Sequence, residues 1–120
     1  MAKLFLGTCV TLAACAPAAA RPVDIRLGED ACAHCRMTIV STRTAAQIVS
    51  PGAEPIFFDD LGCLDAFRSG KTLADGAVTF VIDRDSSGWI DARDAVIRKT
   101  GEPTPMGSGL SATRRKGSTP

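Results

Sequence analysis

The stretch PIFFDDLGCLDAFRSG, residues 55–70, decides the fold. Its first four residues, 55–58, form a short apolar and aromatic run that is typical of a strand. Asp59 and Asp60 follow and are favourable N-cap residues for a helix over residues 61–68. This helix has apolar residues at three-residue spacing, which place them on one face. The residues of that face are Leu61, Leu64 and Phe67.

The segments on either side of this stretch have strand patterns of their own. Apolar runs at residues 37–40 and 45–49 precede it and lead into a Pro-Gly turn. Residues 77–82, AVTFVI, are the most strand-like run in the chain, and shorter runs follow at 89–91 and 95–98. The sequence therefore predicts an α+β domain of ββα-type repeats, in which the second repeat lacks its closing helix.

Length and charge restrict the class of protein. A chain of 120 residues with 45% hydrophobic residues is sufficient for one small domain. Its 14 basic and 13 acidic side chains give a net charge of +1, which provides no electrostatic basis for binding nucleic acid.

The N-terminal residues have the pattern of an export signal. Lys3 precedes an uncharged apolar run over residues 4–14, which is too short to span a bilayer and is typical of a signal peptide. The run ends in Leu-Ala-Ala-Cys15, which resembles the lipobox of bacterial lipoproteins and predicts a lipid on Cys15. An ordinary signal peptide that is cleaved near residues 16–20 is the alternative.

The rest of the chain divides into three parts. Residues 15–29 read as the lipidated cysteine and a tether, with a short strand at Val23–Leu27. Residues 30–110 form the folded domain, in which 104–109 are a Pro/Gly-rich loop. Residues 111–120, SATRRKGSTP, are basic and polar without apolar periodicity, and we expect them to be disordered.

A second stretch, DACAHCRMTIV at residues 30–40, contains the residues with the most distinctive chemistry. A zinc site usually needs a second ligand pair besides Cys32 and Cys35, although Cys63 and His34 could complete a set. A thioredoxin-like motif needs a helix after the second cysteine, whereas Arg-Met-Thr-Ile-Val is strand-like. A structural disulfide between any two of Cys32, Cys35 and Cys63 is a further alternative. Outside the cytoplasm, this odd number of cysteines leaves at least one thiol unpaired or available to a metal.

Met37 adds a second soft sulfur next to Cys35. The two residues are two positions apart, so on a strand their side chains would point to the same face. Thiolate and thioether sulfurs are the ligands that select Cu(I). Met106 is a candidate for the third sulfur because a methionine in a Pro/Gly loop has little core to fill.

Several short motifs taken together resemble the NosL family. They are DACAHCRMTI at residues 30–39, Ala45-Ala-Gln47, FDDLGCL at 58–64, Trp89-Ile-Asp91 and Pro105-Met-Gly107, and they occur in the family's order between about residues 30 and 112. Members of this family are lipoproteins that act as copper chaperones in the maturation of nitrous oxide reductase, an enzyme of denitrification.

The resemblance implies a fold, a ligand set and a location. The fold would be a pair of ββα-type units related to the organomercurial lyase fold. Cys35, Met37 and Met106 would bind Cu(I), with Cys32 or His34 as an additional ligand. The protein would be attached to the membrane by the lipid on Cys15, face the periplasm and deliver copper to an ABC-transporter-linked assembly.

The chain departs from the family pattern at two points. Arg36 stands where the family usually has glycine, and the chain ends soon after Leu110, where members continue into another helix and strand. An ending of this kind would fit a truncated or frame-shifted product. We expect no enzymatic activity, because helix capping accounts for Asp59 and Asp60. The alternative functions are an exported thiol-disulfide oxidoreductase that uses Cys32 and Cys35, and a structural lipoprotein domain with a disulfide.

Overall fold

The computed structural model describes residues 18–119 and confirms an α+β fold. The signal peptide expected at residues 1–14 and the lipidation site Cys15 lie outside the described residues. The elements are β1 (Ala46–Val49), β2 (Ile56–Phe58), α1 (Leu61–Arg68), β3 (Val78–Ile82), β4 (Trp89–Asp91), the 3₁₀ helix η1 (Ala92–Asp94), β5 (Ala95–Lys99) and β6 (Leu110–Arg114).

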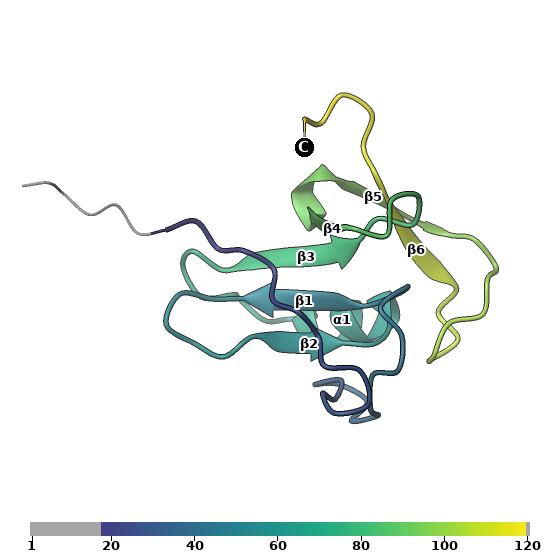
Figure 1. Ribbon diagram of the computed structural model, residues 1–120, viewed down its shortest axis with the longest axis horizontal. Coiled ribbons are helices and arrows are strands. Elements are labelled where there is room, and N and C mark those ends of the chain that lie inside the picture. The colour runs from purple at the N-terminus through teal and green to yellow at the C-terminus, as the bar shows by residue number, and fades with distance from the viewer. Residues whose placement is uncertain (1–17, 120) are drawn as a thin grey trace, which may run out of the picture.

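Four strands form one antiparallel sheet in the order β2-β1-β3-β4 (Figure 1). In the centre of the sheet, Ala46 of β1 pairs with Phe58 of β2 on one side and with Val81 of β3 on the other. A separate hairpin, β5–β6, is joined to this sheet by an isolated bridge between Asp83 and Ala112.

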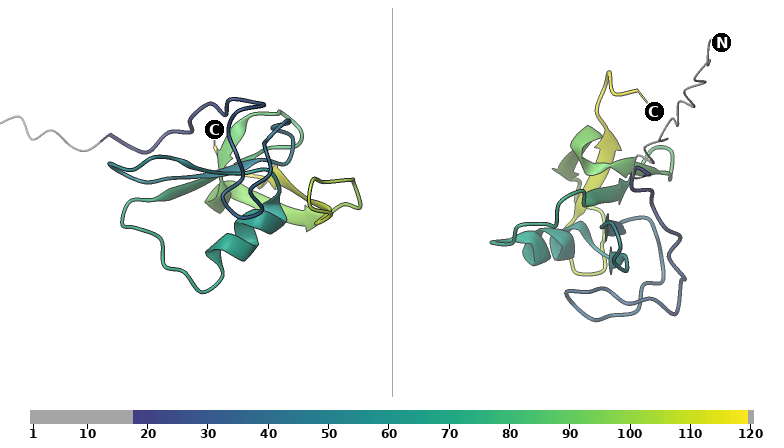
Figure 2. Two further views of the ribbon diagram at one scale, coloured as in Figure 1. Left: turned by 90° about the horizontal axis from the view of Figure 1, so that it is seen from below. Right: turned by 90° about the vertical axis from the view of Figure 1, so that its left-hand side faces the viewer.

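The central strand β1 is buried on both faces, and different parts of the chain cover them. The helix α1 packs on one face of the sheet (Figure 2). Ala46 and Ile48 point to this face, where Phe58, Leu61 and Leu64 are also buried. Gln47 points the other way and is fully buried beneath the N-terminal segment, which crosses the sheet there (Figure 1). Its side-chain amide exchanges two hydrogen bonds with the backbone of Val23, at 2.8 and 3.0 Å. This pairing stands in place of the strand expected at Val23–Leu27, which does not form.

The expected repeat of two ββα units is not confirmed. β3 and β4 extend the sheet that β1 and β2 begin, and β5 pairs with β6 outside it. The run at residues 37–40 also makes no strand. It forms an isolated bridge between Thr38 and Ala31, and its Ile39 side chain is fully buried.

The expected disorder of residues 111–120 is wrong for residues 111–114, which belong to β6. All five residues of β6 pair with β5, and Ala112 is buried against the core. Contacts with residues that are distant in the sequence therefore order this segment, which has no apolar periodicity of its own. The domain boundary expected at residue 110 falls at the start of this strand.

Candidate metal centre

The Cys32–Met37 segment folds into a tight turn. The Cys32 N–H donates to the Met37 carbonyl at 2.9 Å, and the Arg36 N–H donates to the Cys32 carbonyl at 2.9 Å. Ala33 ties the turn to β2 through a 2.9 Å hydrogen bond from its N–H to the Phe57 carbonyl. Arg36 adopts the left-handed conformation that closes the turn, with φ of 67°.

This turn corrects the expectation that Cys35 and Met37 share one face of a strand. Cys35 lies inside the turn, and the left-handed residue Arg36 separates it from Met37. The Cys35 side chain is half-buried, whereas 53% of Met37 is exposed. The expectation assumed that successive side chains alternate between the two faces of a strand. This alternation holds only for extended backbone, and the backbone of this segment is not extended.

The start of α1 supplies the other side of the site. Asp60 is the N-cap, and its side chain accepts a 2.7 Å hydrogen bond from the Gly62 N–H. Asp59 is turned away from the helix, and both of its carboxylate oxygens lie 3.5 Å from the Cys35 Sγ. Helix capping therefore accounts for Asp60 but does not account for Asp59. Cys63 lies in the first turn of the helix and is buried.

Cys32, Cys35, Asp59 and Cys63 converge in one cluster, which we call the thiol cluster. The three sulfurs and one carboxylate oxygen lie within 4.8 Å of one another. Cys32, Asp59 and Cys63 are buried, and Cys35 is the member that is partly open to solvent. Three thiols and a carboxylate at this separation could hold a metal ion.

Two thiols of the cluster, those of Cys35 and Cys63, are poor acids without a metal. Burial raises the pKa of the Cys35 thiol, the Met37 N–H opposes this, and the neighbouring Cys32 and Asp59 raise the pKa further. Burial also raises the pKa of Cys63, and Cys32 and Cys35 add to the effect. Both thiols are therefore protonated at neutral pH, and a binding metal ion would have to displace their protons.

The loop of Met106 approaches the cluster through Asp60. The Met106 N–H donates to the second carboxylate oxygen of Asp60 at 2.9 Å, and the Ser108 hydroxyl donates to the first. The backbone of Met106 is thus hydrogen-bonded to the residue next to Asp59, and 50% of its side chain is exposed.

The expected ligands thus divide into three groups. Cys32 and Cys35 belong to the cluster; Met37 and Met106 are exposed side chains on segments connected to it; His34 lies exposed in the turn and is not a member. The Cu(I) ligand set expected from the sequence omitted Cys63 and Asp59, and Cys63 entered as a possible ligand only of zinc. Two features of the sequence could have identified them. The odd number of cysteines leaves Cys63 available as a ligand. Only one of the adjacent residues Asp59 and Asp60 can be the N-cap, which leaves the other carboxylate free for another role.

Comparison of the chain with protein-family models, with curated proteins and with solved structures finds no match. These comparisons neither support nor contradict the resemblance to the NosL family. In residues 18–119, no helix has the length and apolar character that crossing a membrane requires.

Proposed function

We propose that this protein is a Cu(I)-binding chaperone, attached to the outer side of a membrane through Cys15, that delivers copper for the maturation of nitrous oxide reductase. The observation that carries the proposal is the thiol cluster, in which three cysteine sulfurs lie within 4.8 Å of one another. The delivery role rests on the family resemblance and the lipid anchor on the lipobox that ends at Cys15. The proposal assigns the protein no enzymatic activity.

Copper is the metal that we propose for this donor set. Thiolate is a soft ligand that suits both Cu(I) and zinc, and the thioether sulfurs of Met37 and Met106, on segments connected to the cluster, would favour Cu(I). Cys35 is the natural centre of the site, because it belongs to the buried cluster and is also partly open to solvent. Cys32 and Cys63 would bind the ion from the protein interior. Met37 and Met106 would bind it from the side that faces solvent.

A half-open arrangement of ligands suits transfer of the ion. A delivery protein releases its metal by ligand exchange, so an incoming thiol or thioether of the acceptor must reach the ion. Met37 and Met106 are about half exposed and can be replaced without opening the core. The buried thiols would retain the ion until that replacement occurs.

The test is a Cu(I) titration of the reduced chain against a chromophoric competitor. We expect Cys35→Ser to weaken binding at least about tenfold, which corresponds to about 1.4 kcal/mol. The Met37→Ala/Met106→Ala double variant should weaken it less and speed transfer to a competing chelator. Val40→Ala, which shortens an exposed apolar residue of the same segment, is the control. Wild-type affinity in Cys35→Ser would show the proposal to be wrong.

Delivery is tested separately in cells. Deletion of the protein should lower the copper content of nitrous oxide reductase, and Cys15→Ser should release the protein from the membrane fraction. Normal copper loading of the enzyme in the deletion strain would contradict the proposed chaperone role but would not contradict metal binding by the protein.

The alternative of a thiol oxidoreductase has less support from the site. Such enzymes need a thiolate of low pKa, usually at the start of a helix. Here Cys35 lies in a turn, and burial raises its pKa. Insulin reduction that depends on Cys32 would favour this alternative. Mass mapping that finds a fully oxidised pair of cysteines in protein from the cell envelope would favour the structural disulfide.

A further inference from the structure

A second candidate site adjoins the loop that carries Met106, since Pro103 and Pro105 of this loop line it. It is a cavity of about 410 Å³ between the residue 41–44 segment, the turn after β3 and the loop between β5 and β6. The cavity has a size at which small-molecule sites are common. Its lining is polar at most positions and includes the residues Ser41, Arg43, Thr44, Arg84, Ser87 and Glu102.

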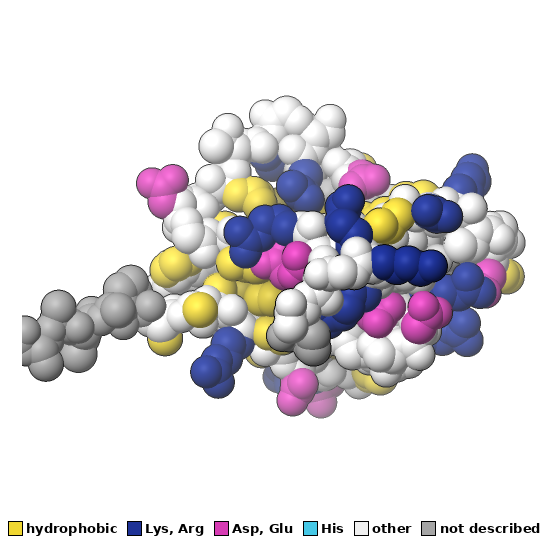
Figure 3. Space-filling model, turned by 90° about the horizontal axis from the view of Figure 1, so that it is seen from above, with side chains coloured by type: hydrophobic (Ala, Val, Ile, Leu, Met, Phe, Trp, Pro, Cys, Tyr) yellow, Lys and Arg dark blue, Asp and Glu magenta, His cyan; other side chains and the backbone are white. Residues whose placement is uncertain are grey.

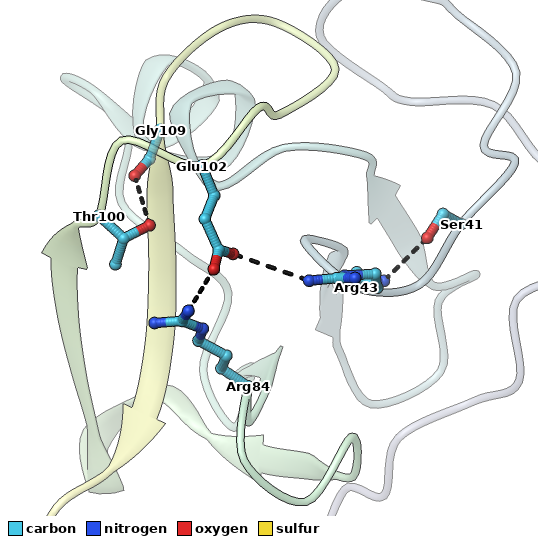
Figure 4. Close-up of polar contacts among 6 residues, drawn as sticks. All are labelled: Ser41, Arg43, Arg84, Thr100, Glu102 and Gly109. Atoms are coloured by element: carbon cyan, nitrogen blue, oxygen red, sulfur yellow. Dashed lines mark hydrogen bonds and ion pairs between the residues drawn. The ribbon is translucent and has the colours of Figure 1, made fainter.

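Two guanidinium groups from separate segments meet in this cavity. Arg43 comes from the loop before β1 and Arg84 from the turn after β3, and the carboxylate of Glu102 lies between them (Figure 4). Glu102 forms an ion pair with Arg43 at 3.7 Å and a shorter one with Arg84. An arginine guanidinium offers several N–H donors in a fixed plane that matches the two oxygens of a carboxylate.

The charge of the cavity is unbalanced. Two arginines face a single glutamate, so the lining has a net positive charge even with Glu102 in place. The side chains of Arg43, Arg84 and Glu102 are 79%, 43% and 38% exposed, and ion pairs this open to solvent contribute little to stability. An incoming anion can therefore replace Glu102 at small cost to the fold.

The hydroxyl groups around the arginines would complete such a site. Ser41, Ser87 and Ser111 line the cavity and can donate to an oxyanion, whereas the Thr44 hydroxyl already donates to the Asp59 carbonyl at 2.8 Å. The walls are formed in part by Ile82, Pro103 and Pro105, which would contact a short carbon chain.

From this arrangement we propose that the cavity between Arg43 and Arg84 binds a small carboxylate anion, with Glu102 as an internal carboxylate that the ligand displaces. Glu102 indicates the ligand class, because it shows a carboxylate held between both guanidinium groups. The site does not depend on the metal proposal, since none of the cluster cysteines lines the cavity.

The test is isothermal titration of the full, reduced chain with succinate, with inorganic phosphate as a second arm, at constant ionic strength. We expect saturable binding of succinate that Arg84→Gln weakens by about tenfold or more. Glu102→Gln should tighten binding by about tenfold, because it removes the competing charge. Arg98→Gln removes an exposed arginine of β5 outside the cavity and should leave the affinity unchanged.

Three results would overturn the proposal. The first is absence of saturable succinate binding in both the wild type and Glu102→Gln. The second is equal weakening by Arg84→Gln and Arg98→Gln, which would indicate general attraction to basic side chains. The third is binding of phosphate as tight as that of succinate, which would contradict the carboxylate class. Thermal unfolding of each variant checks the fold, and Arg43→Gln replaces Arg84→Gln if the latter does not fold.

Discussion

At the scale of single residues, the neighbours Asp59 and Asp60 have different roles. The backbone at Asp60 is extended, with φ of −142° and ψ of 137°, so the two adjacent side chains point in opposite directions. Asp59 faces the thiols, and Asp60 caps α1 and holds the Met106 loop. Burial acts to raise the pKa of Asp60, but the hydrogen bonds from Ser108, Thr104, Gly62 and Met106 outweigh it and hold that pKa below its ordinary value. One doublet thus connects the thiol cluster with the loop that carries Met106.

The turn at Arg36 gives a prediction for a single residue. Its φ of 67° lies in the left-handed region, where a side chain with a Cβ is strained and glycine is not. We expect Arg36→Gly to raise the free energy of unfolding by about 1 kcal/mol, which chemical denaturation of the reduced, metal-free chain would measure.

Arg36→Ala is the matched control for this prediction. It removes the charged side chain but keeps the Cβ, so stability should change by less than about 0.5 kcal/mol. Equal gains in the alanine and glycine variants would show that the side chain, and not the backbone, is the source of the strain.

At the scale of elements, the contact between α1 and the residue 104–108 loop depends on a glycine. A Cβ at Gly62 would lie 2.8 Å from the Ser108 Cβ, closer than two such atoms can approach. Alanine favours a helix over glycine by about 1 kcal/mol, but here the clash should outweigh that gain. We expect Gly62→Ala to lower the free energy of unfolding by about 1–2 kcal/mol in a denaturant titration.

The same substitution in a Ser108→Gly background identifies the cause. The second glycine removes the clashing Cβ, so Gly62→Ala should cost less there than in the wild type. If Gly62→Ala lowered the free energy of unfolding equally in both backgrounds, the contact with the Ser108 Cβ would not be the cause of the destabilisation.

The turn after β3 gives a prediction of pH dependence. Asp83 is buried, and its carboxylate accepts hydrogen bonds from the Ser86 hydroxyl at 2.8 Å and from the Arg114 N–H at 3.3 Å, which ties the turn to β6. Burial acts to raise its pKa, but these hydrogen bonds are stronger and hold the pKa below the ordinary 3.8. Its stabilising effect is therefore fully present above pH 3.8 and is lost as the pH falls below that value.

We expect Asp83→Asn to lower the free energy of unfolding by about 2 kcal/mol at pH 7 and by progressively less below pH of about 4. Denaturant titrations from pH 7 to pH 3 would measure this. The control is Asp85→Asn, an exposed residue of the same turn that should change stability little at any pH. A deficit in Asp83→Asn that is as large at pH 3 as at pH 7 would contradict the assignment.

Local sequence patterns were sufficient for most elements of this fold but not for the site. β1, β2, α1, β3, β4 and β5 lie at their expected places, because each has an apolar run or a capping signal of its own. β6 has none and is ordered by pairing with β5. Cys32, Cys35 and Cys63 meet only because the turn is attached to β2 and α1 begins directly after it, which is a tertiary arrangement that residue spacing does not encode.

At the scale of the whole molecule, the charges are segregated along the chain. Residues 95–119 include five basic side chains and one acidic side chain, whereas the described residues before them have more acidic than basic ones. The face seen in Figure 3 shows Lys and Arg side chains gathered with Asp and Glu side chains among them. A surface with mixed signs of this kind supports solubility rather than the continuous basic patch that nucleic acids require.

The two sheets depend on each other through β6. Ala112 is 1% exposed within the main core, its carbonyl accepts a 2.8 Å hydrogen bond from the Arg84 N–H, and β6 is the strand that pairs with β5. Small domains have a total stability of about 5–15 kcal/mol, so this domain has little reserve against the loss of a strand.

This dependence predicts the effect of shortening the chain. A chain that ends after Gly109 loses all of β6 and leaves β5 unpaired, so we expect it to lack a cooperative thermal transition by circular dichroism. A chain that ends after Arg115 keeps β6 and the 2.7 Å hydrogen bond from the Arg115 N–H to the Asp94 carbonyl, and it should melt within a few degrees of the full chain. If the chain ending at Gly109 melted at the full-chain temperature, β6 would be dispensable. The main sheet and α1 would then hold the thiol cluster without the hairpin, since every cluster residue precedes β3.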